Sequence, residues 1–537
     1  MKLKSILFSF LLGCAVVFSN DTFAQKKSKD DGPTKQLDDI GYRELRNLGT
    51  IIENEEVRGY YLFRREKKTG GGMASFKLDL FDVDIKSLRS IKMQRPKKSQ
   101  LVEMSFNGSA FFLMMTNKKG IDMLTYDPEG KKLGEISIKK VNKYERGRIY
   151  QAMTSKEGSN SSVYPTSNGF VRQTLEKNRK LGYTIEAYSN SMKLQWAVHS
   201  NRVSDKIETA DIMYCSGKYV AVLRMEKKNM MTRDVDMFVL MLDAVTGDKI
   251  FEIPMKELSD LSVLGCHVDE EKNEVYLNGE YFAKGKNIMN SKSEGLYMMK
   301  VDMEGKELKM EKMSWKKDLL SLTVKEEEKG KSNENMRFYI HKVVTAPNGN
   351  TYIIAEQYKK IVSGTAVALN AATALAGGQS NVSNVSIKMY NMVYLVLDKD
   401  FKLIDKQVVK KKFSEFFLEK GYETVSATLL AHYIKANGWF DYQFTSVNKK
   451  TGEFSAFYLD LNRKSAEGKK NDVVLGSIAL VGGNIETKRT PLNTNYSYLF
   501  VYPAKEGHVF VAEYSRSKER LFMRLEPLKF EATEKKK

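Results

Sequence analysis

The chain has 537 residues, of which 42% are hydrophobic and 29% are charged, so it can bury a large core and is not intrinsically disordered. Five histidines and three cysteines exclude a zinc-finger array and a disulfide-dense scaffold. Lysine and arginine number 87 against 67 acidic residues, and the formal net charge of +20 favours an anionic partner without indicating a fold.

The first 24 residues have the pattern of a secretory signal peptide. A start with two lysines leads into a mostly apolar stretch, and Thr22-Phe23-Ala24 places small residues at both ends of the tripeptide before a cleavage site. We therefore expect an exported protein of the periplasm or cell envelope, with no transmembrane span in the mature chain. A second interpretation stays open, because Leu11-Leu12-Gly13-Cys14 resembles a lipobox, which would make the protein a lipoprotein through Cys14.

Residues 101–138 contain one complete unit of the strand pattern that dominates the chain. Short runs rich in aromatic and aliphatic residues lie at 101–106, 110–116, 121–126 and 132–138, separated by turns rich in Gly, Asn and Asp. A four-stranded antiparallel meander of this kind is the blade of a β-propeller. The sequence therefore predicts an all-β protein built from four-stranded blades.

The turn between the third and fourth strands recurs along the chain. It occurs as FDVDIKSLRSI (81–91), TYDPEGKKLGEI (125–136), AYSNSMKLQWAV (187–198), LDAVTGDKIFEI (242–253), VDMEGKELKM (301–310) and LDKDFKLIDK (397–406). Asp and Asn in such turns bond to their own backbone, so we interpret them as hairpin residues and not as metal ligands. The repeat predicts eight blades in a single β-propeller domain at residues 48–530, and seven blades is the alternative, if the first and last units share one blade.

The eighth unit, residues 496–530, shows three strands where the others show four. Residues 25–47 precede the first blade, and their segment 34–44 is expected to supply the missing strand. Strands from both termini would then close the propeller and leave no open sheet edge between its first and last blades. Residues 531–537 form a basic tail.

The strand order assigns the loops to two faces of the predicted domain. Connections between second and third strands lie on one face, and turns between first and second or third and fourth strands lie on the other. The former are basic in every unit, whereas the latter are near neutral or acidic. We therefore expect a basic face that binds an anionic partner. Its candidate residues are Arg64, Arg65, Lys67, Lys68, Lys118, Lys119, Lys177, Arg179, Lys180, Lys227, Lys228, Lys284, Lys286, Lys359 and Lys360.

Residues 361–387 contain no charged side chain, although the chain as a whole is 29% charged. This insert falls in the second-to-third connection of the sixth unit, and residues 366–376 are expected to form a short apolar helix ended by two glycines. An exposed neutral flap is a candidate plug, partner-docking element or membrane-touching loop, and a disordered low-complexity insert is the alternative. The candidate flap residues are Ala366, Leu369, Ala374 and Leu375.

Cys215 and Cys266 lie near the ends of first strands in adjacent predicted blades. A disulfide would need their Cα atoms within about 7 Å, and two buried thiols are the alternative that we favour. His267, His341 and His432 are predicted in the first strands of three consecutive blades, but at different heights, so no metal site is expected. The chain carries no catalytic motif in a fitting context, and we expect no cofactor.

The signal-peptide ending Thr22-Phe23-Ala24-Gln25 and the eight strand units resemble the uncharacterised exported β-propeller proteins of Bacteroidota. The resemblance is architectural, so it implies no functional residue. The expected function is a non-catalytic, monomeric binding or scaffold propeller, whose basic face takes an anionic envelope component or a protein partner and not nucleic acid. The alternative is a propeller-fold glycan hydrolase or lyase with a channel-facing site, which would need two carboxylates, or a His, Tyr and Arg set, in one pocket.

Overall fold

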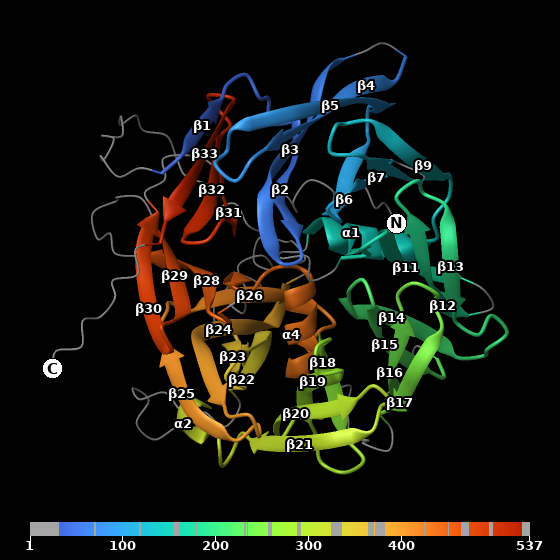
Figure 1. Ribbon diagram of the computed structural model, residues 1–537. Coiled ribbons are helices and arrows are strands. Elements are labelled where there is room, and N and C mark those ends of the chain that lie inside the picture. Colours follow the sequence, from blue (N-terminus) through green and yellow to red (C-terminus); the bar gives the residue numbers. More distant parts are fainter. Residues whose placement is uncertain are drawn as a thin grey trace. The chain divides into compact units, whose positions relative to one another are not determined.

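The structure is a computed structural model that describes residues 32–68, 71–117, 120–154, 161–177, 180–229, 232, 235–255, 260–286, 291–323, 336–363, 370, 382–423, 425–448, 451–462, 472–492 and 498–528. Within these ranges the chain is nearly all-β and forms eight antiparallel sheets, seven of four strands and one of five (Figure 1). The predicted β-propeller of four-stranded blades is confirmed, with eight blades and not seven. No helix in these ranges is long and apolar enough to cross a membrane. The predicted signal peptide and basic tail lie outside them.

Four blades belong to the first of two compact units, which comprises residues 1–141, 190–192 and 442–537. In blade 2 every strand lies within one residue of its predicted range. The strands are β2 (Leu45–Glu53), β3 (Glu56–Lys68), β4 (Met73–Phe81) and β5 (Ser87–Pro96) in blade 1; β6 (Gln100–Phe106), β7 (Phe111–Thr116), β8 (Ile121–Tyr126) and β9 (Lys132–Ile138) in blade 2; β27 (Tyr442–Val447), β28 (Phe454–Asn462), β29 (Asp472–Val481) and β30 (Asn484–Leu492) in blade 7; and β31 (Tyr498–Pro503), β32 (His508–Ser515), β33 (Arg520–Pro527) and β1 (Thr34–Leu37) in blade 8.

Blade 8 combines strands from both ends of the chain, as the sequence predicts. β1 pairs antiparallel with β33, so that Thr34 lies opposite Arg524 and Leu37 opposite Leu521 (Figure 1). The strand is shorter than the predicted segment 34–44. The chain after it is held to blade 8 by a hydrogen bond to its backbone. The Tyr514 hydroxyl donates to the carbonyl of Ile40 at 2.8 Å, and Ile40 is 1% exposed. The last blade therefore has its fourth strand and no open β33 edge.

The other four blades belong to the second unit, which comprises residues 142–189 and 193–441. It also carries the described helices α1 (Lys143–Thr154), α2 (Leu320–Thr323) and α4 (Ala427–Ala436). The strands are β10 (Val163–Thr166), β11 (Gly169–Lys177), β12 (Leu181–Ser189) and β13 (Leu194–His199) in blade 3; β14 (Ile207–Cys215), β15 (Tyr219–Lys227), β16 (Asp236–Asp243) and β17 (Lys249–Pro254) in blade 4; β18 (Leu261–Asp269), β19 (Glu274–Tyr281), β20 (Gly295–Asp302) and β21 (Glu307–Ser314) in blade 5; and β22 (Arg337–Thr345), β23 (Thr351–Val362), β24 (Val382–Leu397), β25 (Leu403–Val409) and β26 (Ser414–Glu419) in blade 6.

Blade 6 is larger than predicted. Its second and third strands continue beyond the ordinary blade, and β26 pairs with the extension of β24 as a fifth strand. The segment around His432, which was predicted as a first strand, instead carries α4, and the first strand of blade 7 begins at Tyr442. The prediction that His432 lies on a first strand is therefore wrong, because this residue is on α4. His267 and His341 do lie on first strands, β18 and β22.

The repeated acidic turns are capped by their own carboxylates, as expected. The Asp302 Oδ1 atom accepts the backbone N–H groups of Glu304 at 3.0 Å and Lys306 at 2.8 Å. The first Asp of the turns in blades 1, 2, 4 and 6 accepts in the same way. These carboxylates are thus used to close hairpins.

Each of these turns also has one residue with a positive φ angle. This residue is either a glycine or a large buried side chain. In blades 2, 4 and 5 this residue is Gly130, Gly247 or Gly305, and a side chain from the fourth strand of the preceding blade fills the space beside it. A Cβ atom on Gly247, for example, would lie 2.7 Å from the ring of Trp196 on β13. Glycine is therefore required there for space as well as for backbone conformation.

In the other case the turn residue is large and fills a space on the preceding blade. Ile85 has φ 61° and is 2% exposed, and it packs in one cluster with Phe510 and Ala504 of blade 8. Phe401 has φ 62°, and its ring lies 6.1 Å from that of Tyr276 on β19. Positive φ is costly for such residues, so their burial has to compensate.

Two glycine-to-alanine variants separate the packing from the backbone contribution. Gly247 and Gly285 have φ of 78° and 73°, but a Cβ on Gly285 meets no atom within 4 Å. We expect G285A to lower the free energy of unfolding by about 1 kcal/mol, the cost of a positive φ for alanine. G247A should cost about 3 kcal/mol, because the methyl group also displaces Trp196. Urea denaturation measures both values, and equal losses would contradict the packing role of this turn.

Candidate functional site

Five predicted basic-face residues are exposed near second-to-third connections of the second unit. They are Lys177 and Lys180 in blade 3, Lys228 in blade 4, and Lys284 and Lys286 in blade 5. None of the five forms an ion pair with another described residue. Lys227 is half-buried at the end of β15, and Lys118, Lys119 and Arg179 lie outside the described residues.

Six other predicted residues are in strands and not in loops, because the hairpins are longer than expected. Arg64, Arg65, Lys67 and Lys68 lie on β3, and Lys359 and Lys360 lie on β23. Arg64 Nε donates to Asp79 Oδ2 at 2.9 Å, and Lys360 Nζ donates to the carbonyl of Val425 at 2.8 Å. Burial lowers the pKa of Lys360. Arg64 and Lys360 thus stabilise the fold and do not add free charge to a loop.

The neutral insert is partly strand, because β23 extends to Val362 and β24 starts at Val382. The candidate flap residues Ala366, Leu369, Ala374 and Leu375, and most of the predicted helix, lie outside the described residues. The two strands are joined at the base of the insert by Glu415. Its Oε1 atom accepts the hydroxyls of Ser363 at 2.6 Å and Ser386 at 2.7 Å. Burial alone would raise the Glu415 pKa, but these hydrogen bonds outweigh it and hold the pKa below its usual value.

A buried ion cluster lies where the extended part of blade 6 begins. Lys411 Nζ is 2.6 Å from Asp441 Oδ2 and 3.1 Å from Glu356 Oε1, and His341 Nε2 is 3.4 Å from Glu356 Oε2. The side chains of Lys411, Glu356 and His341 are fully buried. Burial would lower the pKa of Lys411, but the two carboxylates reverse this and raise it. One buried ammonium group is therefore shared by two acidic side chains from different segments.

Three segments bring these residues together. Glu356 is on β23, where the pairing with β24 shifts register after Glu356. Lys411 lies in the chain between β25 and β26, and Asp441 directly precedes β27. The Ser414 hydroxyl, at the start of β26, also donates to Asp441 Oδ2 at 2.7 Å. The cluster thus lies where the β23–β24 hairpin extends beyond the four-stranded part of blade 6.

Helix α4 packs over this region through one face. Ser426 caps its first turn by accepting the Leu429 N–H at 3.2 Å, and Leu430, Ala431 and Ile434 are fully buried. His432 on the same helix is half-buried with its ring 5.4 Å from that of Tyr339, and burial of the ring lowers its pKa to about 4. The histidine is neutral at ordinary pH.

Glu280 on β19 faces the same helix and is 1% exposed. Burial raises its pKa to about 7, although hydrogen bonds with Thr428 on α4 and with Ser293, and the charge of Arg337, act in the opposite direction. The carboxyl group therefore changes its charge in the physiological range while enclosed between β19 and α4. Sequence reasoning missed this group and the ion cluster, because nothing in the local pattern marks either as buried.

The described residues do not form an accessible acid pair here. Glu356 and Asp441 are both bound by Lys411, and Glu356 is fully buried, so the two carboxylates are already used within the fold. No group of three or more His, Cys, Asp or Glu among the described residues is placed to hold a metal ion. Cys215 and Cys266 are free thiols in this structure. Burial raises the pKa of each thiol to about 12.

Glu280 makes stability depend on pH. Its pKa is higher in the folded state than its ordinary value of 4.5, so its favourable contribution is complete at lower pH and is lost as pH rises towards 7 and above. The glutamine of E280Q is uncharged at every pH. Between pH 5 and pH 8 we expect the free energy of unfolding of E280Q to rise relative to that of the wild type by up to about 3 kcal/mol. The exposed Glu271 supplies the matched control E271Q. Urea denaturation at each pH would contradict this if both variants followed the wild-type curve.

Comparison with known proteins places the chain in a family. No curated protein matches it. Among solved structures, BamB from Moraxella catarrhalis is 8% identical, with 92% of this chain and 99% of that chain covered and a TM-score of 0.35. For the Dos1 propeller the identity is 8%, the coverage 94% and 96%, and the TM-score 0.41. A quinohemoprotein alcohol dehydrogenase from Pseudomonas putida HK5 is 10% identical over 76% of this chain, which spans only 63% of that enzyme, with a TM-score of 0.36.

Likeness at this level does not extend to activity, ligand or partner. The family comparison is more extensive, because one family model matches residues 3–529 and so spans most of the N-terminal segment predicted as a signal peptide and all eight blades. The chain therefore belongs to DUF6770, a family of unknown function.

Proposed function

We propose that this protein is an exported, non-catalytic binding or scaffold propeller whose basic loop face binds an anionic partner in the cell envelope. The observation that carries the proposal is the set of exposed lysines at the connections of blades 3, 4 and 5, namely Lys177, Lys180, Lys228, Lys284 and Lys286. Consecutive blades share one strand order, so these connections leave their sheets at equivalent ends. Lysines without described carboxylate partners create a positive field that attracts anions.

The acidic side chains are used differently. Glu145 on α1 is 3% exposed and pairs with Arg172 at 2.9 Å, and Glu356 is buried against Lys411. The repeated Asp residues of the third-to-fourth turns accept backbone N–H groups. Glu145 and Glu356 are thus paired with basic groups inside the fold, whereas the five lysines remain exposed.

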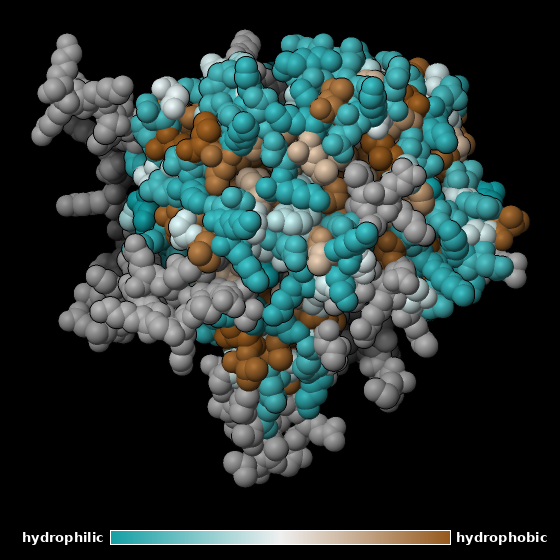
Figure 2. Space-filling view, turned by 90° about the horizontal axis from the view of Figure 1, so that it is seen from below, coloured by the Kyte–Doolittle hydropathy of each residue, from teal (hydrophilic) through white to brown (hydrophobic). Residues whose placement is uncertain are grey.

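The visible surface suits a polar contact. Figure 2, a view from below that of Figure 1, shows mostly hydrophilic residues, with hydrophobic ones in separate patches. Binding through charge fits such a surface better than binding through a large apolar interface. The neutral insert, anchored by Glu415 at its base, is proposed as a second contact with the partner.

Export rests on the first 24 residues, whose basic start, apolar stretch and Thr22-Phe23-Ala24 ending have the signal-peptide pattern. A mature protein outside the cytoplasm would meet the anionic polymers and lipids of the envelope and not nucleic acid. A glycan hydrolase or lyase would need an open acid pair, and the Glu356 and Asp441 pair is already bridged by Lys411.

Two five-fold charge reversals test the proposal with the same change in net charge. One replaces Lys177, Lys180, Lys228, Lys284 and Lys286 with Glu. The control replaces five exposed lysines of first-to-second or third-to-fourth turns, Lys86, Lys131, Lys193, Lys218 and Lys306, in the same way. We expect the first variant to elute from heparin, an anionic polysaccharide, at clearly lower salt than the control, because binding depends on local charge. Equal elution of the two variants would overturn the proposed face.

A further inference from the structure

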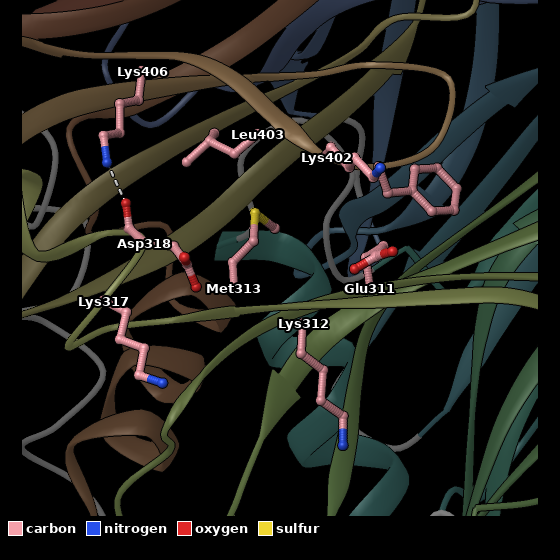
Figure 3. A pocket seen from close by; sticks show the side chains of 9 residues that line it. Glu311, Lys312, Met313, Lys317, Asp318, Lys402, Leu403 and Lys406 are labelled. Atoms are coloured by element: carbon pink, nitrogen blue, oxygen red, sulfur yellow. Dashed lines mark hydrogen bonds between the residues drawn. The ribbon is translucent and has the colours of Figure 1, made fainter.

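A pocket of about 370 Å³ lies between the outer strand of blade 5 and the third-to-fourth turn of blade 6. Its wall from blade 5 is formed by Glu311, Lys312 and Met313 on β21, with Lys317 and Asp318 after the strand. The other wall is formed by residues 401–403 and Lys406 of blade 6. Figure 3 shows Met313 near the middle, with Asp318 and Lys406 on one side and Glu311 and Lys402 on the other.

The floor of this pocket is apolar and well packed. Phe401, the turn residue with positive φ, is 2% exposed, and Met313 is 4% exposed. Leu403 is half-buried beside them. The floor is therefore held in place by the packing between blades 5 and 6 and does not depend on a ligand.

The rim carries an excess of positive charge. Four lysines line the pocket against two acidic residues: Lys312, Lys317, Lys402, Lys406, Glu311 and Asp318. Lys406 Nζ donates to the backbone carbonyl of Asp318, and the Asp318 Oδ2 atom accepts the Ser314 N–H at 2.8 Å. Lys317 and Lys402 are exposed and form no ion pair with another described residue. Their charges are available to an anion.

We propose that this pocket binds an acidic sugar, that is, a monosaccharide-sized unit carrying a phosphate or a carboxylate. The volume is at the small end of ligand pockets and fits one such unit. The ammonium groups of Lys317 and Lys402, on opposite sides of the pocket, attract the anionic group, and the carboxylates of Glu311 and Asp318 accept sugar hydroxyls. The apolar face of the ring lies on Met313 and Leu403.

A bare anion fits these residues less well than an acidic sugar. The carboxylates of Glu311 and Asp318 repel a simple phosphate ion, but they bind the hydroxyl donors of a sugar. The site is separate from the five lysines of the basic loop face, so it stands or falls independently of the proposed function.

Isothermal titration calorimetry on the wild type tests the ligand class. The probes are D-glucose 6-phosphate, D-glucuronate, D-glucose and inorganic phosphate, each raised to millimolar concentration. We expect saturable binding of at least one acidic sugar, with affinity about tenfold above that of glucose or of phosphate. Binding of one acidic sugar alone identifies which anionic group the lysines prefer. Phosphate binding as tight as the sugar phosphate would overturn the assignment to a sugar, and no saturable binding of either acidic sugar would overturn the site.

The double variant K317A/K402A tests the location. These exposed lysines do not support the core, and we expect the affinity for the acidic sugar to fall about tenfold or more with unchanged thermal stability. The control K284A/K286A removes the same charge from blade 5 and should keep wild-type affinity. E311Q should weaken the binding of the acidic sugar, because it removes a carboxylate acceptor for a hydroxyl group. The same variant should strengthen the binding of phosphate, because it removes a negative charge. Equal affinities of the two double variants would refute the pocket as the binding site.

Discussion

Packing between the third-to-fourth turns of blades 1, 2, 4, 5 and 6 and the blade before each is the interaction on which the other features of this protein depend. The hairpin requires one residue with positive φ, which costs a non-glycine residue roughly 1 kcal/mol. Glycine avoids that cost and admits a neighbour such as Trp196, whereas Ile85 and Phe401 accept it and bury a whole side chain, worth roughly 2 kcal/mol. Each of these turns is thereby matched to one neighbour, and the pocket beside Phe401 lies at one such junction.

Much of this architecture could be predicted because its signals are local. The Asp turns mark every hairpin from blade 1 to blade 6 except that of blade 3, and the missing strand of the last unit pointed to the N-terminal segment. Strand ends were harder, since the length of β3 depends on its pairing partners and not on its own composition, which misplaced Arg64 and Arg65. The Ser426 cap and the apolar run after it are sequence signals for helix α4. Lys411, in contrast, lies in a run of three lysines, a pattern typical of a solvent-exposed segment.

Blade 6 shows how buried charge can define geometry without adding much stability. An ion pair removed from water gains little net free energy, but it tolerates few arrangements. Lys411 joins Asp441, which is 30 residues away, to Glu356, and Glu415 joins the two strands beneath the neutral insert. In blade 6, the blade with the fifth strand and α4, buried charges therefore fix how the described segments beyond the ordinary blade are joined.

Closure by β1 has a consequence for the order in which the chain folds. The hydroxyl of Tyr514 reaches the carbonyl of Ile40 across 474 positions of sequence, so the contact forms only after nearly the whole chain exists. Contacts of such range are slow to form, and β33 is meanwhile an unpaired edge able to recruit other chains. Completion of the final sheet is thus a late step in folding. A chain that lacks β1 would keep β33 as an unpaired edge strand, open to pairing with other chains.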